Sequence, residues 1–282
     1  MGLYCEQLSG SSFTQTRHKN LRSWLYKINP TVGHTSHSQI DQNEFKNWIS
    51  DFESSNEENL TVTPDQIRWK VFPFPDKNKK IDFLHGIFTY CGVGSPGLKN
   101  GLSVHLYSCN TSMEENTAFY SSDGDFLIVP QHGELHVTTE LGKLNVKPKE
   151  IVILPRGLRF RVDVEGESRG YICEIYKGHF TLPDLGPIGS NGLANARDFE
   201  VPVAWYEDKQ CEFKVISKFC GKFFSCNYKN SIFNTVAWWG NYVPYKYDLN
   251  KFNTIGTVSY DHPDPSIFTV LTASSDEAGY YI

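Results

Sequence analysis

The sequence predicts an all-β protein with little helix and long irregular loops, and three observations support this. Aromatic residues make up 14% of the 282 residues, including 19 Phe and 15 Tyr, and they favour sheets over helix bundles. Between residues 122 and 162, short apolar runs alternate with glycine-containing turns, a pattern typical of antiparallel strands joined as hairpins. Further runs of this kind lie on both sides, whereas helical spacing is confined to residues 34–63.

The stretch from Ser122 to Val162 organises the chain. Its apolar runs are separated by glycine turns at His132-Gly133 and at Leu141-Gly142-Lys143. Pro155-Arg156-Gly157 forms a sharp corner, because proline fixes φ and glycine can adopt a positive φ. This succession resembles the core of the cupin family, and the resemblance implies a small jelly-roll barrel. The strands predicted here are Phe126–Val129, Leu135–Val137, Ile151–Leu154 and Phe160–Val162.

The positions where metal-binding cupins carry their ligands are altered in this sequence. Such cupins have a His-x-His pair and a Glu after the first glycine of the core, and another His three residues past the Pro-x-Gly corner. Here the first ligand position is Pro130 and the last is Phe160. His132 alone cannot supply the three or four donors that a transition metal needs. We therefore expect this barrel to hold no metal.

His132 also allows a second interpretation. The run His132-Gly-Glu-Leu-His136 has the form of a metal triad, since alternate residues share one face of a strand. Gly133, however, puts His132 in the turn. Leu135, Val137 and Thr139 are the better inward set, so both histidines are expected to face solvent.

Strands are predicted on both sides of the central stretch, from apolar or alternating runs bounded by turn residues. They are Arg22–Ile28, Ile67–Phe72, Asp82–Cys91, Leu102–Cys109, Gly170–Tyr176, Val201–Tyr206, Glu212–Phe219, Lys222–Ser225, Val236–Gly240, Thr254–Tyr260 and Ile267–Thr272.

Other segments interrupt this series. Residues 34–63 form a polar, exposed excursion in which Phe45, Trp48, Ile49 and Phe52 are spaced like one face of a short helix. A loop rich in glycine and proline, at Gly92–Gly101, joins two predicted strands. A longer one, Leu182–Asn195, is expected to be functional or interfacial. His85 and His105 fall in apolar strands and are expected in the core, and His179 at a surface or interface.

Composition excludes several classes of protein. A net charge of −5 with dispersed Lys and Arg gives no basis for nucleic-acid binding. The seven cysteines include no Cys-x-x-Cys pair, so neither a disulfide framework nor a zinc site is implied, and reduced thiols in the cytoplasm are expected. The first residues do not form a secretory signal, and no apolar run reaches the ~20 residues of a membrane helix.

Five long phrases, in order along nearly the whole chain, resemble the homogentisate 1,2-dioxygenase family. The resemblance implies Fe(II)-dependent cleavage of homogentisate by O₂ to maleylacetoacetate, in tyrosine and phenylalanine breakdown, by a homo-oligomer. The phrases are Tyr4–Thr14, Ser122–Gln131, Leu182–Gly189 with Asn191–Asn195, Val236–Tyr247 and Asp261–Ala273.

The resemblance also implies an organisation. Residues 1–247 would be the N-terminal jelly-roll domain, with an N-terminal arm and the excursion 34–63, and residues 248–282 the truncated start of a second cupin domain. In the family, two His and one Glu of that second barrel hold the iron, and no position here matches them. We therefore expect no metal ligand, no cofactor and no measurable turnover for this chain alone, although the resemblance implies that the complete family member is an enzyme.

His262 is the one catalytic residue that the resemblance assigns. It lies in the phrase Asp-His-x-Asp-Pro, whose histidine accepts a proton from the ring hydroxyl in the family. Imidazole titrates near neutral pH, Pro263 and Pro265 stiffen the turn, and Asp261 or Asp264 could orient the second nitrogen. The alternative is a histidine that only fills a polar turn. Two other functions remain open: docking onto full-length subunits, and binding of a small molecule in a metal-free barrel.

Overall fold

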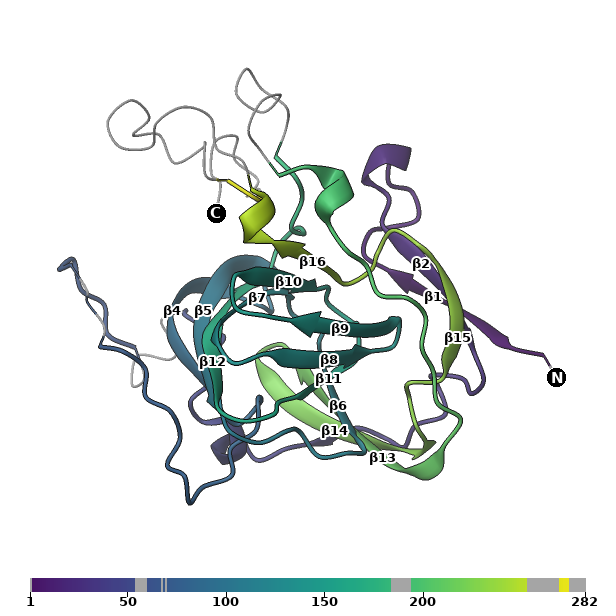
Figure 1. Cartoon of the computed structure of the whole chain (residues 1–282), viewed down its shortest axis with the longest axis horizontal. Helices are drawn as coiled ribbons and strands as arrows, with labels where there is room; N and C mark the ends of the chain where they lie inside the picture. The colour runs from purple at the N-terminus through teal and green to yellow at the C-terminus, as the bar shows by residue number, and fades with distance from the viewer. Residues whose placement is uncertain are drawn as a thin grey trace.

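Two β-sheets pack face to face and enclose the main core of the molecule (Figure 1). The computed structural model describes residues 2–53, 60–66, 68, 70–183, 194–252 and 269–273. The first sheet has six strands in the order β16 (Tyr245–Asp248), β10 (Glu150–Leu154), β7 (Asp125–His132), β12 (Ser168–Ile175), β5 (Asn100–Cys109) and β4 (Ile87–Ser95).

The second sheet has seven strands, and one of its pairings, β13 with β6, is parallel. The order is β3 (Ser38–Gln39), β14 (Lys222–Asn230), β13 (Gln210–Phe219), β6 (Thr117–Ser121), β11 (Phe160–Asp163), β8 (Leu135–Thr139) and β9 (Gly142–Val146). From β7 to β12 the chain passes back and forth between the two sheets, which is jelly-roll connectivity. The predicted all-β jelly roll is therefore confirmed, and the helices of the described residues are short 3₁₀ turns.

The core between the sheets is aromatic. Phe119, Phe126 and Phe160 come from three strands, and their ring centroids lie 5.6 to 6.4 Å apart. Phe160 meets the other two rings edge-to-face, whereas Phe119 and Phe126 are stacked, and such contacts add to the burial of apolar area. Leu135, Val137 and Thr139 are fully buried, as predicted, because successive side chains of a strand point to opposite faces.

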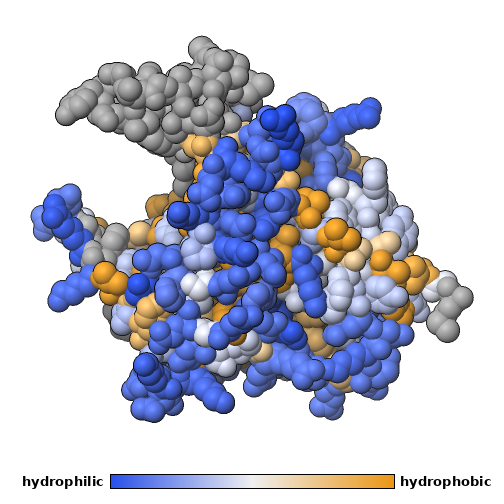
Figure 2. Space-filling view, in the orientation of Figure 1, coloured by the Kyte–Doolittle hydropathy of each residue, from blue (hydrophilic) through white to orange (hydrophobic). Residues whose placement is uncertain are grey.

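A third sheet lies beside the barrel and consists of β1 (Tyr4–Ser9), β2 (Arg22–Lys27) and β15 (Thr235–Gly240). Strand β2 of this sheet has a charged residue on its buried face and aromatic residues on its exposed face. Leu25 and Lys27 are buried against the barrel, whereas Trp24 and Tyr26 are 41% and 38% exposed. Trp239 lies opposite Trp24 on β15 and is 77% exposed. Figure 2 shows apolar and weakly polar surface over this side of the molecule.

Several predicted elements are wrong. Residues 42–45 form a single 3₁₀ turn instead of a helix, and Phe45 and Trp48 are buried in the main core, so this part of the excursion is not exposed. Residues 82–86 form a turn before β4, and β4 continues to Ser95, leaving only a tight turn at residues 96–99. Residues 70–72 and 201–206 are not strands.

The other predicted strands are present, with shifted ends. Residues 245–248 of the aromatic corner also form a strand, β16, at the edge of the first sheet. The predicted strand 254–260 and most of the loop 182–195 lie outside the described residues. Of the last predicted strand, residues 269–272 are described and form only an isolated bridge, between Thr272 and Thr181. No helix in the described ranges is long and apolar enough to cross a membrane.

Candidate functional site

The interior positions that carry ligands in metal cupins are apolar here. Phe160 is 2% exposed and contacts Phe119 and Phe126 edge-on. Pro130 is buried on β7, on the same face as Ile128 of the main core. His132 is exposed at the end of β7, and His136 faces outward, 3.1 Å from the Asn145 side chain. Within the described ranges, these positions therefore cannot form a metal site, and both histidines face solvent as predicted.

One end of the barrel interior instead holds a network of charges, which we call the interior charge network: Asp123, Glu174, Lys218 and His105. The ammonium of Lys218 donates to both carboxylate oxygens of Glu174, at 2.8 and 2.9 Å, and to Asp123 at 3.0 Å. All three side chains are at most 1% exposed. Since an ammonium has three N–H groups, its donors are fully used.

Hydrogen bonds from the surrounding backbone and side chains complete this network. The backbone N–H groups of Cys220 and Gly221 donate to Asp123, at 2.6 and 2.9 Å. Ser121 donates to Glu174 at 2.9 Å. His105 lies 3.4 Å from Glu174 through Nε2 and 2.8 Å from the Thr89 hydroxyl through Nδ1, so it is a hydrogen-bonded core histidine as predicted.

The protonation states follow from these contacts. Burial acts to raise the pKa of Glu174, but the charge of Lys218 and the hydrogen bond from His105 lower it to about 2. Burial acts to lower the pKa of Lys218, but Glu174 and Asp123 raise it above its ordinary value. Burial lowers the pKa of His105. At neutral pH Glu174 is therefore ionised, Lys218 is protonated and His105 is neutral, and each of these three groups is paired within the network.

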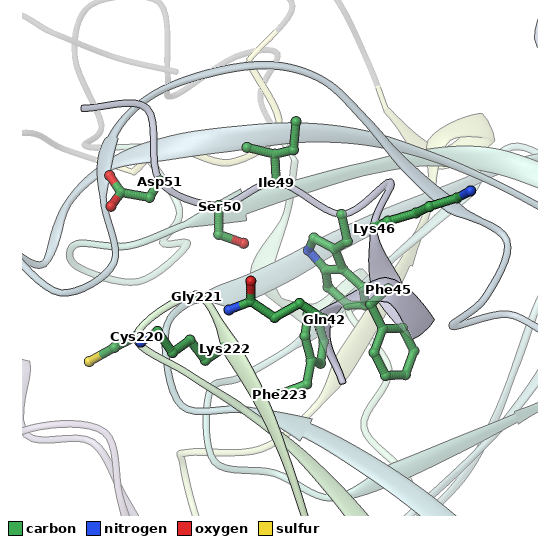
Figure 3. A pocket seen from close by; sticks show the side chains of 11 residues that line it. Gln42, Phe45, Lys46, Ile49, Ser50, Asp51, Cys220, Gly221, Lys222 and Phe223 are labelled. Atoms are coloured by element: carbon green, nitrogen blue, oxygen red, sulfur yellow. The ribbon is translucent and has the colours of Figure 1, made fainter. Parts of the chain in front are cut away.

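A pocket of about 300 Å³ opens next to this network, between residues 42–51 and the β13–β14 turn (Figure 3). Trp48 and Ser50 line it and are 5% and 3% exposed, yet Trp48 Nε1 and Ser50 Oγ have no hydrogen-bond partner in the described structure. Figure 3 shows Ser50 and Gln42 pointing into the same space. Buried polar groups are normally paired. The two unpaired groups therefore indicate that the pocket can accommodate water or a small polar molecule.

A second set of buried charges joins the three-stranded sheet to the barrel. Lys27 donates to Glu140 at 2.7 Å, and Arg159 donates to both oxygens of that carboxylate at 3.2 Å. Burial acts to raise the pKa of Glu140, and Lys27 and Arg159 lower it. These ion pairs explain why β2 can bury Lys27, whereas Trp24 lies on the opposite, exposed face of the same strand.

Of two further histidines, one agrees with its prediction and one does not. His179, predicted at a surface or interface, lies at a contact between segments, 2.7 Å from Asp125 Oδ2 and 2.6 Å from the carbonyl oxygen of Gly10, so it connects the chain near Gly10 to the barrel. His85 is not in the core, because the chain turns there. Its ring is 38% exposed and lies 2.7 Å from Asp82 Oδ1, a contact that raises the pKa of His85.

Three donors suited to a metal meet outside the barrel, at His34, His37 and Cys226. The predicted proton acceptor, His262, lies outside the described residues, as do Asp261 and Asp264. The sequence interpretation missed Glu174 and Lys218, although each occupies an inward position of an alternating strand. A charge at such a position is the signal that could have identified them.

The strand order and the apolar ligand positions define a cupin-like jelly roll whose described interior has no metal-donor set. The family is shown by sequence comparison. The model for "Homogentisate 1,2-dioxygenase N-terminal" matches residues 1–249, and the model for "Homogentisate 1,2-dioxygenase C-terminal" matches residues 250–282. The chain belongs to the homogentisate 1,2-dioxygenase family.

Curated relatives agree with this assignment. The chain is 54% identical over 278 residues to homogentisate 1,2-dioxygenase from Caenorhabditis elegans, and 53% identical over 284 residues to the enzyme from Homo sapiens. Each alignment covers 99% of this chain but 62% of the relative, so the chain spans less than two thirds of their length.

Similarity to solved structures is weaker. A cupin-2 domain protein from Shewanella frigidimarina has a TM-score of 0.24 at 15% identity, covering 26% of this chain and 70% of that one. A conserved protein of unknown function from Streptococcus pyogenes has a TM-score of 0.31 at 12% identity, covering 45% and 99% respectively.

Proposed function

We propose that this chain is the N-terminal part of a homogentisate 1,2-dioxygenase, which uses Fe(II) and O₂ to cleave the ring of homogentisate to maleylacetoacetate in tyrosine and phenylalanine catabolism. The observation that carries this proposal is the match of both family models, one after the other, over the whole chain. We place the domain boundary as residues 1–247 and 248–282. Seven free cysteines support a cytoplasmic location.

The iron site is proposed to lie outside this chain. A non-haem Fe(II) site with open positions uses two histidines and one carboxylate. The described metal-donor group, His34, His37 and Cys226, has a thiol in place of the carboxylate and lies outside the barrel. It does not fit Fe(II) of this kind. We infer that the 282-residue chain alone neither holds catalytic iron nor turns over substrate.

His262 is proposed as the residue that accepts the proton of the ring hydroxyl once the iron-binding barrel is present. Its neighbours Asp261 and Asp264 are the candidates to orient the second nitrogen, since a general base must be held by a partner. The competing role, a histidine in a polar turn, predicts no effect on turnover when the side chain is replaced.

An activity assay tests these proposals. Product formation from homogentisate with Fe(II), ascorbate and air is measured for the 282-residue chain and for a complete family enzyme carrying this chain as its N-terminal part. We expect activity only for the complete enzyme, and a fall of at least about 100-fold for its His262→Ala variant, as removal of a general base costs 10²–10⁴-fold. Turnover by the chain alone contradicts the first proposal, and unchanged turnover of His262→Ala contradicts the second.

The alternative function is docking onto full-length subunits as part of a homo-oligomer. The exposed aromatic residues Trp24, Tyr26 and Trp239 on one face of the three-stranded sheet favour it, because such patches mark interaction surfaces. Co-expression of the chain with a complete enzyme tests it. We expect co-purification that Trp239→Ser weakens, with Val62→Ser, at a side chain 98% exposed elsewhere, as the control. Failure to co-purify contradicts this function.

A further inference from the structure

His34, His37 and Cys226 meet at the edge of the seven-stranded sheet, outside the barrel and away from the interior charge network. One ligand atom from each lies within 4.8 Å of the others. Cys226 is on β14 and is 3% exposed. The register of β3 on β14 pairs Ser38 with Ser225, and extending it by one residue places His37, just before β3, opposite Cys226. The backbone therefore holds these two side chains as cross-strand neighbours.

The loop that carries His34 is fixed to the same strand. The N–H of Thr35 donates to the carbonyl of Asn227 at 2.9 Å, and the N–H of Asn227 donates back to the Thr35 hydroxyl at 3.0 Å. The His34 ring lies against His37, with ring centroids 4.8 Å apart, and against Tyr228 at 5.6 Å. Both imidazoles are thus brought to the thiol by contacts that do not involve a ligand.

One further contact selects the ligand nitrogen of His34. Its Nδ1 lies 2.6 Å from the carbonyl oxygen of Thr35. A carbonyl only accepts, so Nδ1 carries the proton and Nε2 has the free lone pair. Metal-binding histidines use the same arrangement, in which a hydrogen bond at one nitrogen orients the other toward the metal.

The donor types indicate which ion fits. Two imidazoles and a thiolate are ligands of zinc, which is bound tetrahedrally by nitrogen and sulfur, whereas Mg²⁺ and Ca²⁺ need oxygen ligands. Ligand atoms around zinc are about 3.5 Å apart, so the group must contract by roughly 1 Å. His37 is exposed and can make this movement. Burial raises the pKa of the Cys226 thiol and lowers that of His37, and Arg159, whose charge is balanced by Glu140, acts to lower both pKa values.

We propose that His34, through Nε2, together with His37 and Cys226 forms a binding site for one zinc ion, with the fourth position open to water. This inference is independent of the proposed ring cleavage and goes against the expectation that the chain holds no metal. The spacing of residues in the sequence could not reveal this site, because Cys226 lies 189 residues after His37.

The test is a titration of the metal-free, reduced 282-residue chain with Co²⁺, a spectroscopic substitute for zinc. We expect saturation at one equivalent, with an absorption band of thiolate-to-cobalt charge transfer, and displacement by Zn²⁺ but not by Mg²⁺ or Ca²⁺. Cys226→Ser and His37→Ala are expected to lose the band and to weaken Zn²⁺ binding by more than about 100-fold, since even the partners that orient ligands are worth 10–100-fold.

Matched controls are the exposed residues Cys5 and His18, whose replacement in Cys5→Ser and His18→Ala is expected to leave the titration unchanged. Circular dichroism and the urea midpoint establish that each variant is folded, and Cys226→Ala serves if Cys226→Ser is not. Absence of stoichiometric Co²⁺ binding overturns the proposal. So does a charge-transfer band that persists in the Cys226 variant, because it would report another thiol.

Discussion

The ammonium of Lys218 and the carboxylate of Glu174 form a salt bridge inside the barrel, with N–O distances of 2.8 and 2.9 Å and both side chains fully buried. The two residues come from different sheets, β13 and β12, so the pair connects the two layers of the jelly roll. A buried pair of this kind costs desolvation energy but is strongly destabilising when only one partner is removed.

Replacing Lys218 by Met is therefore expected to lower the free energy of unfolding by about 3–5 kcal/mol, because Glu174 and Asp123 are left as buried anions without a cation. Urea unfolding followed by circular dichroism measures this change. Lys209→Met is the matched control: Lys209 pairs with Glu115 at 2.6 Å in solvent, and its loss is expected to have a far smaller effect. Equal effects of the two substitutions would contradict this role of Lys218.

The stability of the chain is expected to fall in acid partly through Glu174. Its pKa is about 2 in the folded chain against an ordinary 4.5, so the unfolded chain takes up this proton first as the pH decreases. The contribution is complete above pH 4.5 and is lost as the pH falls toward 2. In urea unfolding between pH 5 and 3, Glu174→Gln should reduce the slope of stability against pH by up to about 1.4 kcal/mol per unit. An unchanged slope would show that Glu174 does not titrate in this way.

Phe160 occupies the place of a metal ligand in the barrel and is expected to act as a core residue. Phe160→Ala should cost about 3–5 kcal/mol of unfolding free energy, from lost burial and the cavity left behind. Phe13 is 79% exposed, and Phe13→Ala should stay within about 0.5 kcal/mol. If Phe160→Ala were equally mild, the interior would not be close-packed at this position.

Gly101, near the start of β5, has a φ of +90°, and a Cβ there would lie 1.8 Å from the carbonyl oxygen of Val93. Gly101→Ala is expected to destabilise the chain by more than about 1 kcal/mol, since the backbone must leave this conformation or strain it. A Cβ at Gly166 would have no atom within 4 Å, so Gly166→Ala serves as the comparison, with a change within about 0.5 kcal/mol. Thermal unfolding of both variants measures the two changes in stability, and equal changes would contradict the role of Gly101.

Much of the fold could be predicted because apolar alternation marks strands directly. The central strands, their glycine turns and the inward set Leu135, Val137 and Thr139 follow from that pattern. The prediction of an exposed short helix in the excursion 34–63 is wrong. Phe45 and Trp48 have helical spacing, but their segment is irregular apart from a 3₁₀ turn, and it packs both side chains into the main core. Tertiary contacts, and not local propensity, decide the structure there.

The interior charge network could not be predicted as a whole. Lys218 pairs with Glu174 and Asp123, which lie 44 and 95 residues away in the sequence, and no local pattern links residues so far apart. The same holds for Lys27, whose partner Glu140 is 113 residues away. The sequence shows only that each charged residue has an inward position in its strand. Such a position indicates that the buried charge has a partner, but it does not identify that partner.

The proposal that the iron ligands lie outside this chain is tested most directly by dioxygen uptake. The measurement uses the purified 282-residue chain supplied with Fe(II), ascorbate and homogentisate. We expect uptake no faster than that of the same mixture without protein, because the described barrel offers no site for catalytic iron. Dioxygen consumed in proportion to homogentisate by this chain alone would contradict the proposal that its iron ligands lie elsewhere.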